Sequence, residues 1–305
     1  MERVAIFVLL LVTLPIQKIY TAEIDIISDL QFLTENDTLV SSARTFELGF
    51  FKPGSSGNSY LGIWYKKISV KTVVWVANRD LPLSVGSSGV LKIVHPGSLV
   101  LMSNNGIMWS SNTTSSGNAI AKLDDMGNLV MMTDGDNKNI IWQNPAPGEF
   151  TDSTDTHGYP QYVLKQGADK IKFRVGPWNG MGFSGDSTFG RNNIFTYNMV
   201  INETMVAYTY DLINSSVVSR LTLISSGELQ RSVWVEDATN WQLVVRFPRD
   251  ICDLYNICGA YGSCSTVKTQ RCSCLDEPKF VPRNSKGWED ADWSGGCMRR
   301  TSLEL

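Results

Sequence analysis

The first 251 residues of this 305-residue chain contain no cysteine. Disulfides are therefore excluded from most of the molecule, and all six cysteines fall at or after position 252. That last segment is short and poor in apolar runs, so it buries too little surface to fold without cross-links. Six cysteines allow many pairings, and spacing alone selects none of them. A zinc cluster is the alternative, but Cys272 and Cys274 stand closer than paired zinc ligands usually do, and no histidine lies near them.

Histidine is almost as scarce, since the chain has only His95 and His157. Both lie next to Gly or Pro in predicted turns, and no Gly-x-Ser-x-Gly nucleophile motif accompanies them. Asp124 and Asp125 precede Met-Gly-Asn, which favours a solvated turn over a catalytic pair. Asp134 begins a stretch that lacks the other ligands of a calcium loop. Kinase nucleotide-loop, His-Arg-Asp and Asp-Phe-Gly motifs are absent too, so we predict no enzyme, no metal and no cofactor.

Beyond its N-terminus the chain has no apolar run of the length that crosses a bilayer, which is about 20 residues. Behind Arg3, a shorter apolar run from Val4 to Leu14 is typical of a secretory signal, with predicted cleavage after Ala22. An uncleaved anchor is the alternative. We expect the mature chain to be secreted, with no membrane span after signal removal, in a compartment that favours disulfides.

Four Asn-x-Ser/Thr sequons support the same route, because N-glycans are added to secreted chains. They begin near predicted turns, at Asn36, Asn112, Asn202 and Asn214. The charges are scattered singly, with 27 basic and 30 acidic residues and a net charge of −3. Such a chain has no basic patch, so nucleic acid is not an expected partner.

The chain also lacks helix-period apolar stripes between Thr45 and Gln143. Short runs of β-branched and aromatic residues alternate there with Gly, Asn and Ser clusters, which predicts an all-β fold. Trp75, Trp109 and Trp142 recur after aliphatic residues at spacings of 34 and 33. We expect three similar sheet units around a pseudo-threefold axis, each giving one Trp to a shared core. A simple preference of strands for Trp is the alternative.

Several motifs in the chain resemble those of one plant family. Phe46-Glu-Leu-Gly-Phe-Phe51 and Val73-Val-Trp-Val-Ala-Asn-Arg-Asp80 are similar to the bulb-type (mannose-binding) lectin domain that opens S-locus glycoproteins and S-domain, or G-type lectin, receptor-like kinases. Gly176-Pro-Trp-Asn-Gly180 and the cysteine-rich segment from Cys252 to Cys297 continue the resemblance in the family's order. On these motifs the chain is identified as a member of that family.

The resemblance implies an all-β fold class with three domains, which follow the signal peptide predicted above. The segments are a signal peptide at 1–22, a bulb-lectin β-prism at 23–145, a shortened β-rich S-locus glycoprotein domain at 146–248 and a disulfide-stapled EGF-like module at 249–305. In EGF-like modules the first cysteine pairs with the third, the second with the fourth and the fifth with the sixth. Here that implies Cys252 with Cys264, Cys258 with Cys272, and Cys274 with Cys297. Only Asp250 precedes the first cysteine closely, so calcium is not expected.

The sugar-binding motif of the family is mostly lost. Mannose-binding bulb lectins use Gln-x-Asp-x-Asn-x-Val-x-Tyr, whose polar side chains bond to sugar hydroxyls. The copy at 94–102 keeps only Val100, and the copy at 124–132 keeps Asn128 and Val130. Each lost hydrogen bond costs about 1 kcal/mol or more of binding. We therefore predict a scaffold with a degenerate sugar-site remnant, and carbohydrate binding is the alternative function.

Two segments of the family are missing. Strands that relatives carry between Trp142 and Phe150 do not occur, and the chain stops at Leu305, before the PAN, transmembrane and kinase regions. The resemblance implies a secreted, non-catalytic recognition module, as in recognition of pollen type. Its expected partner is a protein or peptide ligand or a related S-domain receptor, with a glycan as a further candidate. A non-functional truncated receptor-kinase fragment is the alternative, because the gap falls where the first two domains join.

Contact surfaces of the family fall in its variable middle segment, here residues 184–210. Aromatic and Met side chains of the kind enriched at interfaces occur in this segment. They are Phe189, Phe195, Tyr197, Met199 and Tyr208. These five residues form the predicted partner surface, and the packing of alternate members into the core of a sheet is the competing interpretation.

Overall fold

A computed structural model describes residues 24–115, 117–135, 140–145, 148–185, 193–202, 206–214 and 216–301. The expected signal peptide and Phe189 lie outside these ranges. The chain forms two compact units, Met1–Pro145 (unit 1) and Ala146–Leu305 (unit 2). No helix among the described residues has the length and apolarity that a membrane crossing requires.

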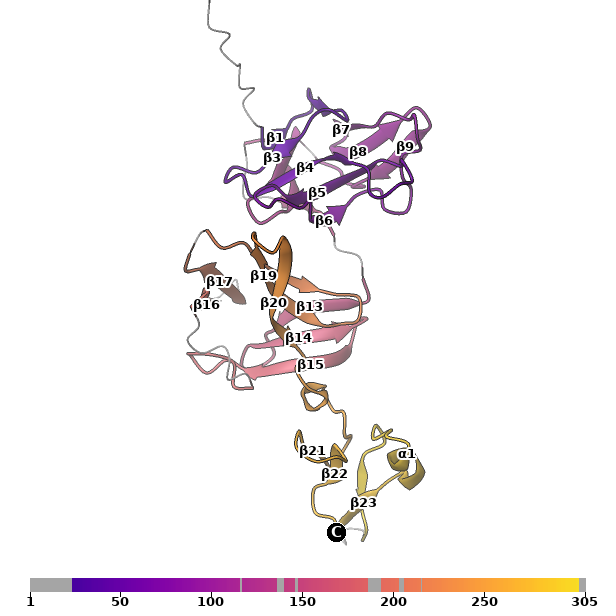
Figure 1. Cartoon of the computed structure of the whole chain (residues 1–305), viewed down its shortest axis with the longest axis vertical. Helices are drawn as coiled ribbons and strands as arrows, with labels where there is room; N and C mark the ends of the chain where they lie inside the picture. The colour runs from indigo at the N-terminus through magenta and orange to yellow at the C-terminus, as the bar shows by residue number, and fades with distance from the viewer. Residues whose placement is uncertain are drawn as a thin grey trace, which may run out of the picture. The chain divides into compact units, whose positions relative to one another are not determined.

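Unit 1 contains three antiparallel sheets of four strands each (Figure 1). The first sheet has the order β3 (Leu39–Val40), β4 (Phe46–Phe51), β5 (Tyr60–Tyr65) and β6 (Val73–Val76). The second has the order β2 (Phe32–Leu33), β7 (Val90–Val94), β8 (Ser98–Ser103) and β9 (Gly106–Ser110). The third has the order β1 (Ile26–Ile27), β10 (Ala119–Leu123), β11 (Leu129–Thr133) and β12 (Ile140–Gln143). The expected all-β fold is confirmed.

The three repeated tryptophans of unit 1 pack against one another. Trp75, Trp109 and Trp142 lie on β6, β9 and β12, the last strand of each sheet. Their ring centroids are 5.6, 5.7 and 6.5 Å apart, and each pair meets edge to face. The predicted repeat of three sheet units that share a Trp core is confirmed. The indole Nε1 of Trp75 also donates a 3.0 Å hydrogen bond to the carbonyl of Pro145, the last residue of unit 1.

The segment before Thr45 completes all three sheets. The two-residue strands β1, β2 and β3 pair with β10, β7 and β4, respectively. The segment before the repeats therefore adds one short strand to each of the three sheets. The sequence-based expectation starts the strands at Thr45 and misses these three. A two-residue strand carries no readable period, and its pairing partner is selected by the tertiary fold.

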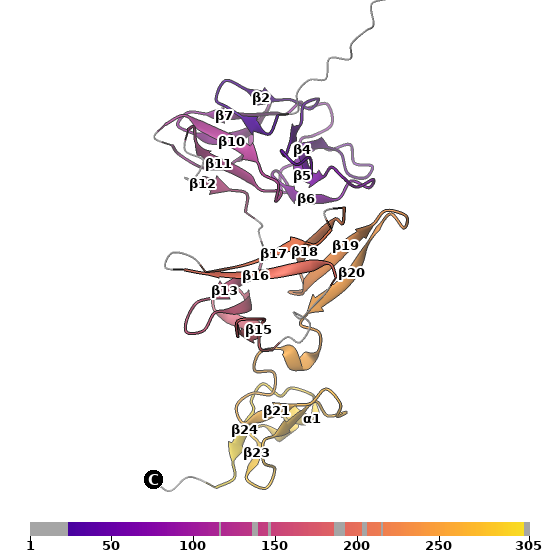
Figure 2. The same ribbon diagram turned by 90° about the vertical axis from the view of Figure 1, so that its left-hand side faces the viewer.

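Unit 2 begins with eight strands in three antiparallel groups (Figure 2). The first sheet is β13 (Phe150–Asp155), β14 (Gln161–Gln166) and β15 (Lys170–Pro177). The hairpin is β16 (Phe195–Ile201) and β17 (Val206–Leu212), and the second sheet is β18 (Ser219–Leu223), β19 (Leu229–Val235) and β20 (Asn240–Phe247). Buried side chains from both sheets form one core, which contains Leu164, Phe173, Val175, Phe183, Leu229 and Phe247.

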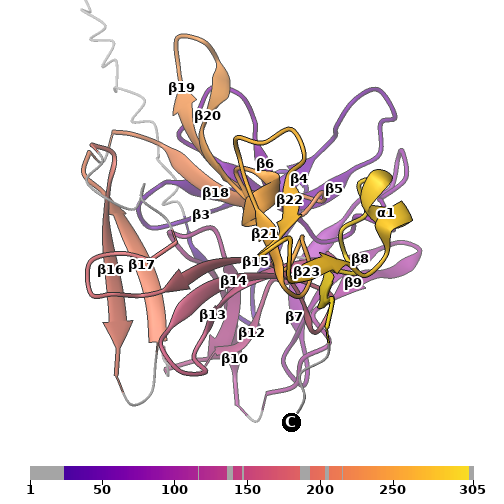
Figure 3. The same cartoon turned by 90° about the horizontal axis from the view of Figure 1, so that it is seen from below.

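After β20, unit 2 continues in short elements (Figure 3), and three disulfides cross-link this segment. The elements are η2 (Ile251–Asp253), β21 (Gly262–Cys264), β22 (Cys272–Cys274), β23 (Phe280–Pro282), α1 (Ser285–Glu289) and β24 (Cys297–Arg299). The disulfides join Cys252 to Cys264, Cys258 to Cys272 and Cys274 to Cys297, the same pairs that the EGF-like resemblance implies. Four of these cysteines are buried with Phe280 and Trp288, so sulfur supplies much of this small core.

Candidate functional site

The β16–β17 hairpin presents an aromatic face. Successive side chains of a strand alternate between its two faces, so Phe195, Tyr197 and Met199 lie on the same side of β16. Tyr197 is directly opposite Tyr210, and Met199 is directly opposite Tyr208. Directly opposed residues of an antiparallel pair share a face. The hairpin therefore turns Tyr and Phe rings from both strands in one direction.

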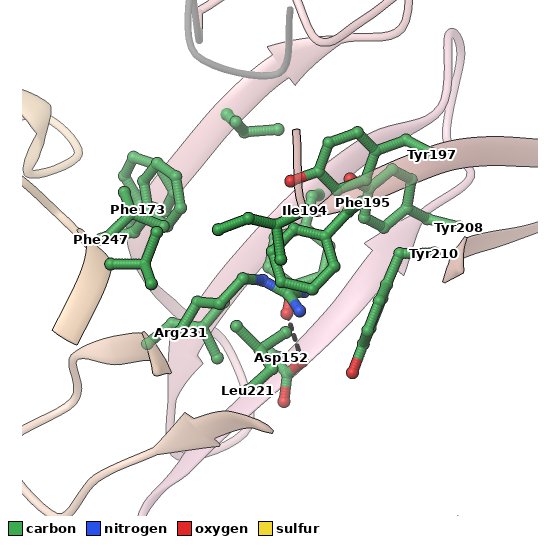
Figure 4. Close-up of a pocket in the computed structure, with 15 residues that line it drawn as sticks. Asp152, Phe173, Ile194, Phe195, Tyr197, Tyr208, Tyr210, Leu221, Arg231 and Phe247 are labelled. Atoms are coloured by element: carbon green, nitrogen blue, oxygen red, sulfur yellow. Dashed lines mark hydrogen bonds between the residues drawn. The ribbon is translucent and has the colours of Figure 1, made fainter. Parts of the chain in front are cut away.

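This face closes one side of a cavity in unit 2, which we call the aromatic pocket (Figure 4). The pocket has a volume of about 350 Å³, and residues of the hairpin and of both sheets line it. Rings dominate the lining, among them Tyr162, Phe173, Phe195, Tyr197, Tyr210 and Phe247. Two charged residues, Asp152 and Arg231, also line it. A concave apolar site with a few polar groups has the composition of a ligand pocket.

Arg231 lies on β19, the central strand of the second sheet, and only 4% of its surface is exposed. Arg231 pairs with Val245 of β20, and the next residue, Ser232, pairs with Leu243. Val244 is therefore one extra residue on β20, which forms a β-bulge at this point. Bulges redirect neighbouring side chains. The Arg231 guanidinium carbon lies 3.9 Å from the ring centroid of Tyr210 and 4.3 Å from that of Phe195. Its Nη1 is buried and has no hydrogen-bond partner among the described residues.

The other charged group belongs to β13. The Tyr162 hydroxyl donates a hydrogen bond to the carboxylate of Asp152, which is itself exposed to solvent. Thr154 is directly opposite Tyr162, so Asp152 is the diagonal neighbour of Tyr162 on the same face. Burial raises the pKa of Tyr162, and the negative charge of Asp152 and the hydrogen bond to it raise the pKa further. Tyr162 therefore stays a neutral donor at physiological pH.

The structure places the predicted partner surface partly inside the pocket. Phe195 is 4% exposed, and the rings of Tyr197 and Tyr208 stack with centroids 5.6 Å apart; all three residues line the cavity. Met199 packs against the core of unit 2, and Phe189 lies outside the described residues. The competing interpretation, packing against the interior, describes Phe195 and Met199 better than an exposed surface does.

Sequence reasoning missed most of the residues that line this site, among them Asp152, Tyr162, Tyr210 and Arg231. Arg231 had a readable signal, because it stands two residues after Leu229 in a strand and so shares the core-facing side. An arginine at such a position is rarely buried without a partner. Asp152 and Tyr162 lie far from Arg231 in sequence, and only the packing of the two sheets brings them together.

In unit 1 the two retained positions of the sugar motif are engaged within the protein. The Asn128 side chain donates a 3.0 Å hydrogen bond to the Asp124 carboxylate, which also accepts the backbone N–H of Asn128 at 2.8 Å. Val130 is 4% exposed and packs with Ile120 and Met132. The described residues 124–132 thus use these side chains to build the turn and the sheet.

The predicted modification sites are accessible. All four sequon asparagines are exposed, namely Asn36, Asn112, Asn202 and Asn214. The six cysteines all form disulfides, and no free cysteine occurs.

Two family models match the chain. The S-locus glycoprotein domain matches residues 173–284, and the D-mannose binding lectin matches residues 72–157. One similar solved structure is a monomeric mannose-binding lectin from Gastrodia elata, which is 21% identical, with a TM-score of 0.30 and coverage of 39% of this chain and 93% of that chain.

Curated relatives match across both units. The receptor-like serine/threonine-protein kinase SD1-8 of Arabidopsis thaliana is 36% identical over 313 residues, which cover 89% of this chain and 36% of the kinase. The S-locus-specific glycoprotein BS29-2 of Brassica oleracea var. alboglabra is 36% identical over 311 residues, which cover 89% of this chain and 71% of that protein. The chain thus spans about a third of the receptor kinase and most of the glycoprotein. It belongs to the family of S-locus glycoproteins and G-type lectin S-receptor-like kinases.

Proposed function

We propose that the chain is a secreted, non-catalytic recognition module that binds a protein or peptide partner or a related S-domain receptor. The observation that carries this proposal is the match to an S-locus-specific glycoprotein over 89% of the chain. Recognition of pollen type is the setting that we propose from this relationship. The lectin and S-locus glycoprotein matches support binding rather than chemistry.

The proposed domain organisation follows the sequence-based boundaries. A bulb-type lectin domain occupies 23–145, an S-locus glycoprotein domain 146–248 and an EGF-like module 249–305. The division of the chain after Pro145 and the three disulfides beyond Asp250 support these boundaries. The four exposed sequon asparagines support passage through the secretory route.

We assign the partner contact to the β16–β17 hairpin, which carries most of the variable middle segment. Its inner face lines the aromatic pocket, whereas Thr196 and Asn198 are exposed on the outer face. A two-stranded hairpin can pair with a partner through the backbone groups along its strand edges, and its outer face offers polar side chains to the same partner.

The match to a D-mannose binding lectin favours a second candidate, glycan binding by unit 1. The hydrogen bonds of Asn128 to Asp124 and the burial of Val130 weigh against it, because a sugar would have to compete for groups that already have partners. We therefore assign unit 1 a scaffold role.

The test expresses the whole chain in a eukaryotic host and measures its secretion, its free thiols and its binding to two immobilised probes. The probes are the ectodomain of the receptor kinase SD1-8 and a second copy of this chain. We expect protein in the medium, no free thiols and measurable binding to one probe. Asn198→Arg should weaken that binding roughly tenfold or more by blocking the outer face, whereas the matched change Asn118→Arg in unit 1 should not. Retention in the cell with free thiols would instead identify a non-functional fragment.

A further inference from the structure

We infer that the aromatic pocket of unit 2 binds a small aromatic carboxylate, with Arg231 pairing the carboxylate group and the surrounding rings holding the aromatic body. The inference assigns a ligand class to the inner face of the hairpin. It rests on the proposed recognition role of the same unit, but it concerns a small molecule rather than the macromolecular partner of the outer face.

The first argument is the charge of Arg231. A guanidinium stays protonated at any physiological pH, and a buried charge is costly unless a partner satisfies it. Phe195 and Tyr210 offer ring faces at 4.3 and 3.9 Å, which attract the cation. A ring face is not a strong hydrogen-bond acceptor, and Nη1 is buried without a hydrogen-bond partner among the described residues. A carboxylate oxygen supplies the missing acceptor with a charge-assisted hydrogen bond.

The second argument is the position of the competing charge. Asp152 is the acidic residue among those that line the pocket, and it is exposed and accepts the Tyr162 hydroxyl. Solvent screens an exposed charge far more than a buried one. The buried end of the pocket is therefore positive, and an anion enters without meeting an equally buried negative charge.

The third argument is the shape and size of the cavity. Its volume of about 350 Å³ lies near the lower end of the range for ligand pockets, which is roughly 300–1,000 Å³. Near-parallel ring pairs flank it: Phe173 and Phe247 are inclined by 24°, and Tyr197 and Tyr208 by 14°. Flat walls of this kind fit a planar ring system, which stacks on them in offset or edge-to-face contacts. The space suits a one- or two-ring acid rather than a peptide.

The test is isothermal titration calorimetry of the secreted full chain with three probes. Naphthalene-2-carboxylate has both the rings and the charge, naphthalene-2-methanol keeps the rings without the charge, and decanoate keeps the charge without the rings. We expect naphthalene-2-carboxylate to bind at least roughly tenfold more tightly than either control, because each control lacks one of the two required contacts.

Arg231→Met removes the charge and keeps an extended apolar side chain. We expect this variant to lose naphthalene-2-carboxylate binding by roughly tenfold to a hundredfold. The matched control is Arg220→Met, since Arg220 also stacks on an aromatic ring, that of Trp241 at 4.2 Å, but does not line the pocket. If Arg231→Met is not secreted as a folded chain, the three-probe comparison on the unmodified protein decides the question.

Four results would overturn the inference. They are no heat with naphthalene-2-carboxylate, equal affinity for the alcohol, equal affinity for decanoate, or unchanged affinity in a folded Arg231→Met variant. Binding of the SD1-8 ectodomain or of a second copy, measured in parallel with Asn198→Arg, reports on the proposed function separately. Intact partner binding without naphthalene-2-carboxylate binding would therefore reject the pocket ligand alone.

Discussion

The side-chain amide of Asn128 donates a 3.0 Å hydrogen bond to the carboxylate of Asp124. Both residues occupy positions of the degenerate sugar motif, and each is engaged by the other. We predict that the chain does not bind mannose measurably. The affinity for methyl α-mannoside, measured by titration calorimetry, should stay undetectable in the millimolar range. Asp124→Ala, which frees the Asn128 amide, should not create binding, because the other polar positions of the motif are absent. Retention on a mannose column that free mannose reverses would contradict the scaffold role of unit 1.

Removal of Trp75 should lower the stability of unit 1 more than removal of either of the other two repeated tryptophans. It is 5% exposed, contacts the rings of Trp109 and Trp142, and donates a hydrogen bond to Pro145. Trp75→Ala should destabilise unit 1 by about 3–5 kcal/mol, and Trp75→Phe should cost less because a ring remains. Hydrogen exchange of peptides from residues 24–145 measures the effect, with Trp241→Ala in unit 2 as control. Unchanged exchange in Trp75→Ala would show that the shared Trp core does not stabilise the unit.

Removal of one disulfide should unfold the C-terminal segment and leave unit 1 folded. Cys274 and Cys297 are 23 positions apart, and closing such a loop contributes about 3–4 kcal/mol in the chain-entropy model. That is a large share of the stability of so small a core. In the double variant Cys274→Ala/Cys297→Ala, we expect rapid hydrogen exchange in residues 252–301 and native exchange in residues 24–145 of the same molecule. Equal protection of the segment in both proteins would argue against stabilisation by this bond.

Tyr162 should make the stability of unit 2 fall at alkaline pH. Its pKa is raised in the folded state, chiefly by burial and then by Asp152, so the unfolded chain loses this proton more easily. The stabilising contribution is fully present below the unfolded value of about 10 and declines as the pH rises above it. Urea midpoints measured from about pH 8 to 11 should fall more steeply for the unmodified chain than for Tyr162→Phe. Tyr159→Phe, at an 80% exposed tyrosine, is the control and should follow the unmodified curve.

The sequence predicted some features of the fold well because they are local. Period-2 runs and turn residues are enough to indicate strands, and the spacing of Trp75, Trp109 and Trp142 indicates three equivalent sheets. The strands β1 to β3 were not predictable in this way. Ile26 pairs with Lys122, far along the chain, and two residues show no period of their own.

The candidate site was predicted only in part. Alternation along β16 places Phe195, Tyr197 and Met199 on one face, but it does not say whether that face meets solvent or the interior. The structure turns Phe195 toward Arg231 and places both Phe195 and Tyr197 in the pocket lining, and this assignment depends on how the hairpin packs against sheets whose sequences lie before and after it.

The sequence by itself therefore determined the all-β class, the threefold repeat of unit 1 and the confinement of the cysteines to the C-terminal segment, because each depends on residue types at short, regular spacing. Only the tertiary structure decided that Arg231 is buried against two rings without a hydrogen-bond partner for Nη1 among the described residues, and that Asp152 and Tyr162 share its pocket. Burial and charge environment arise from contacts between segments remote in sequence, and such contacts leave no local pattern to read.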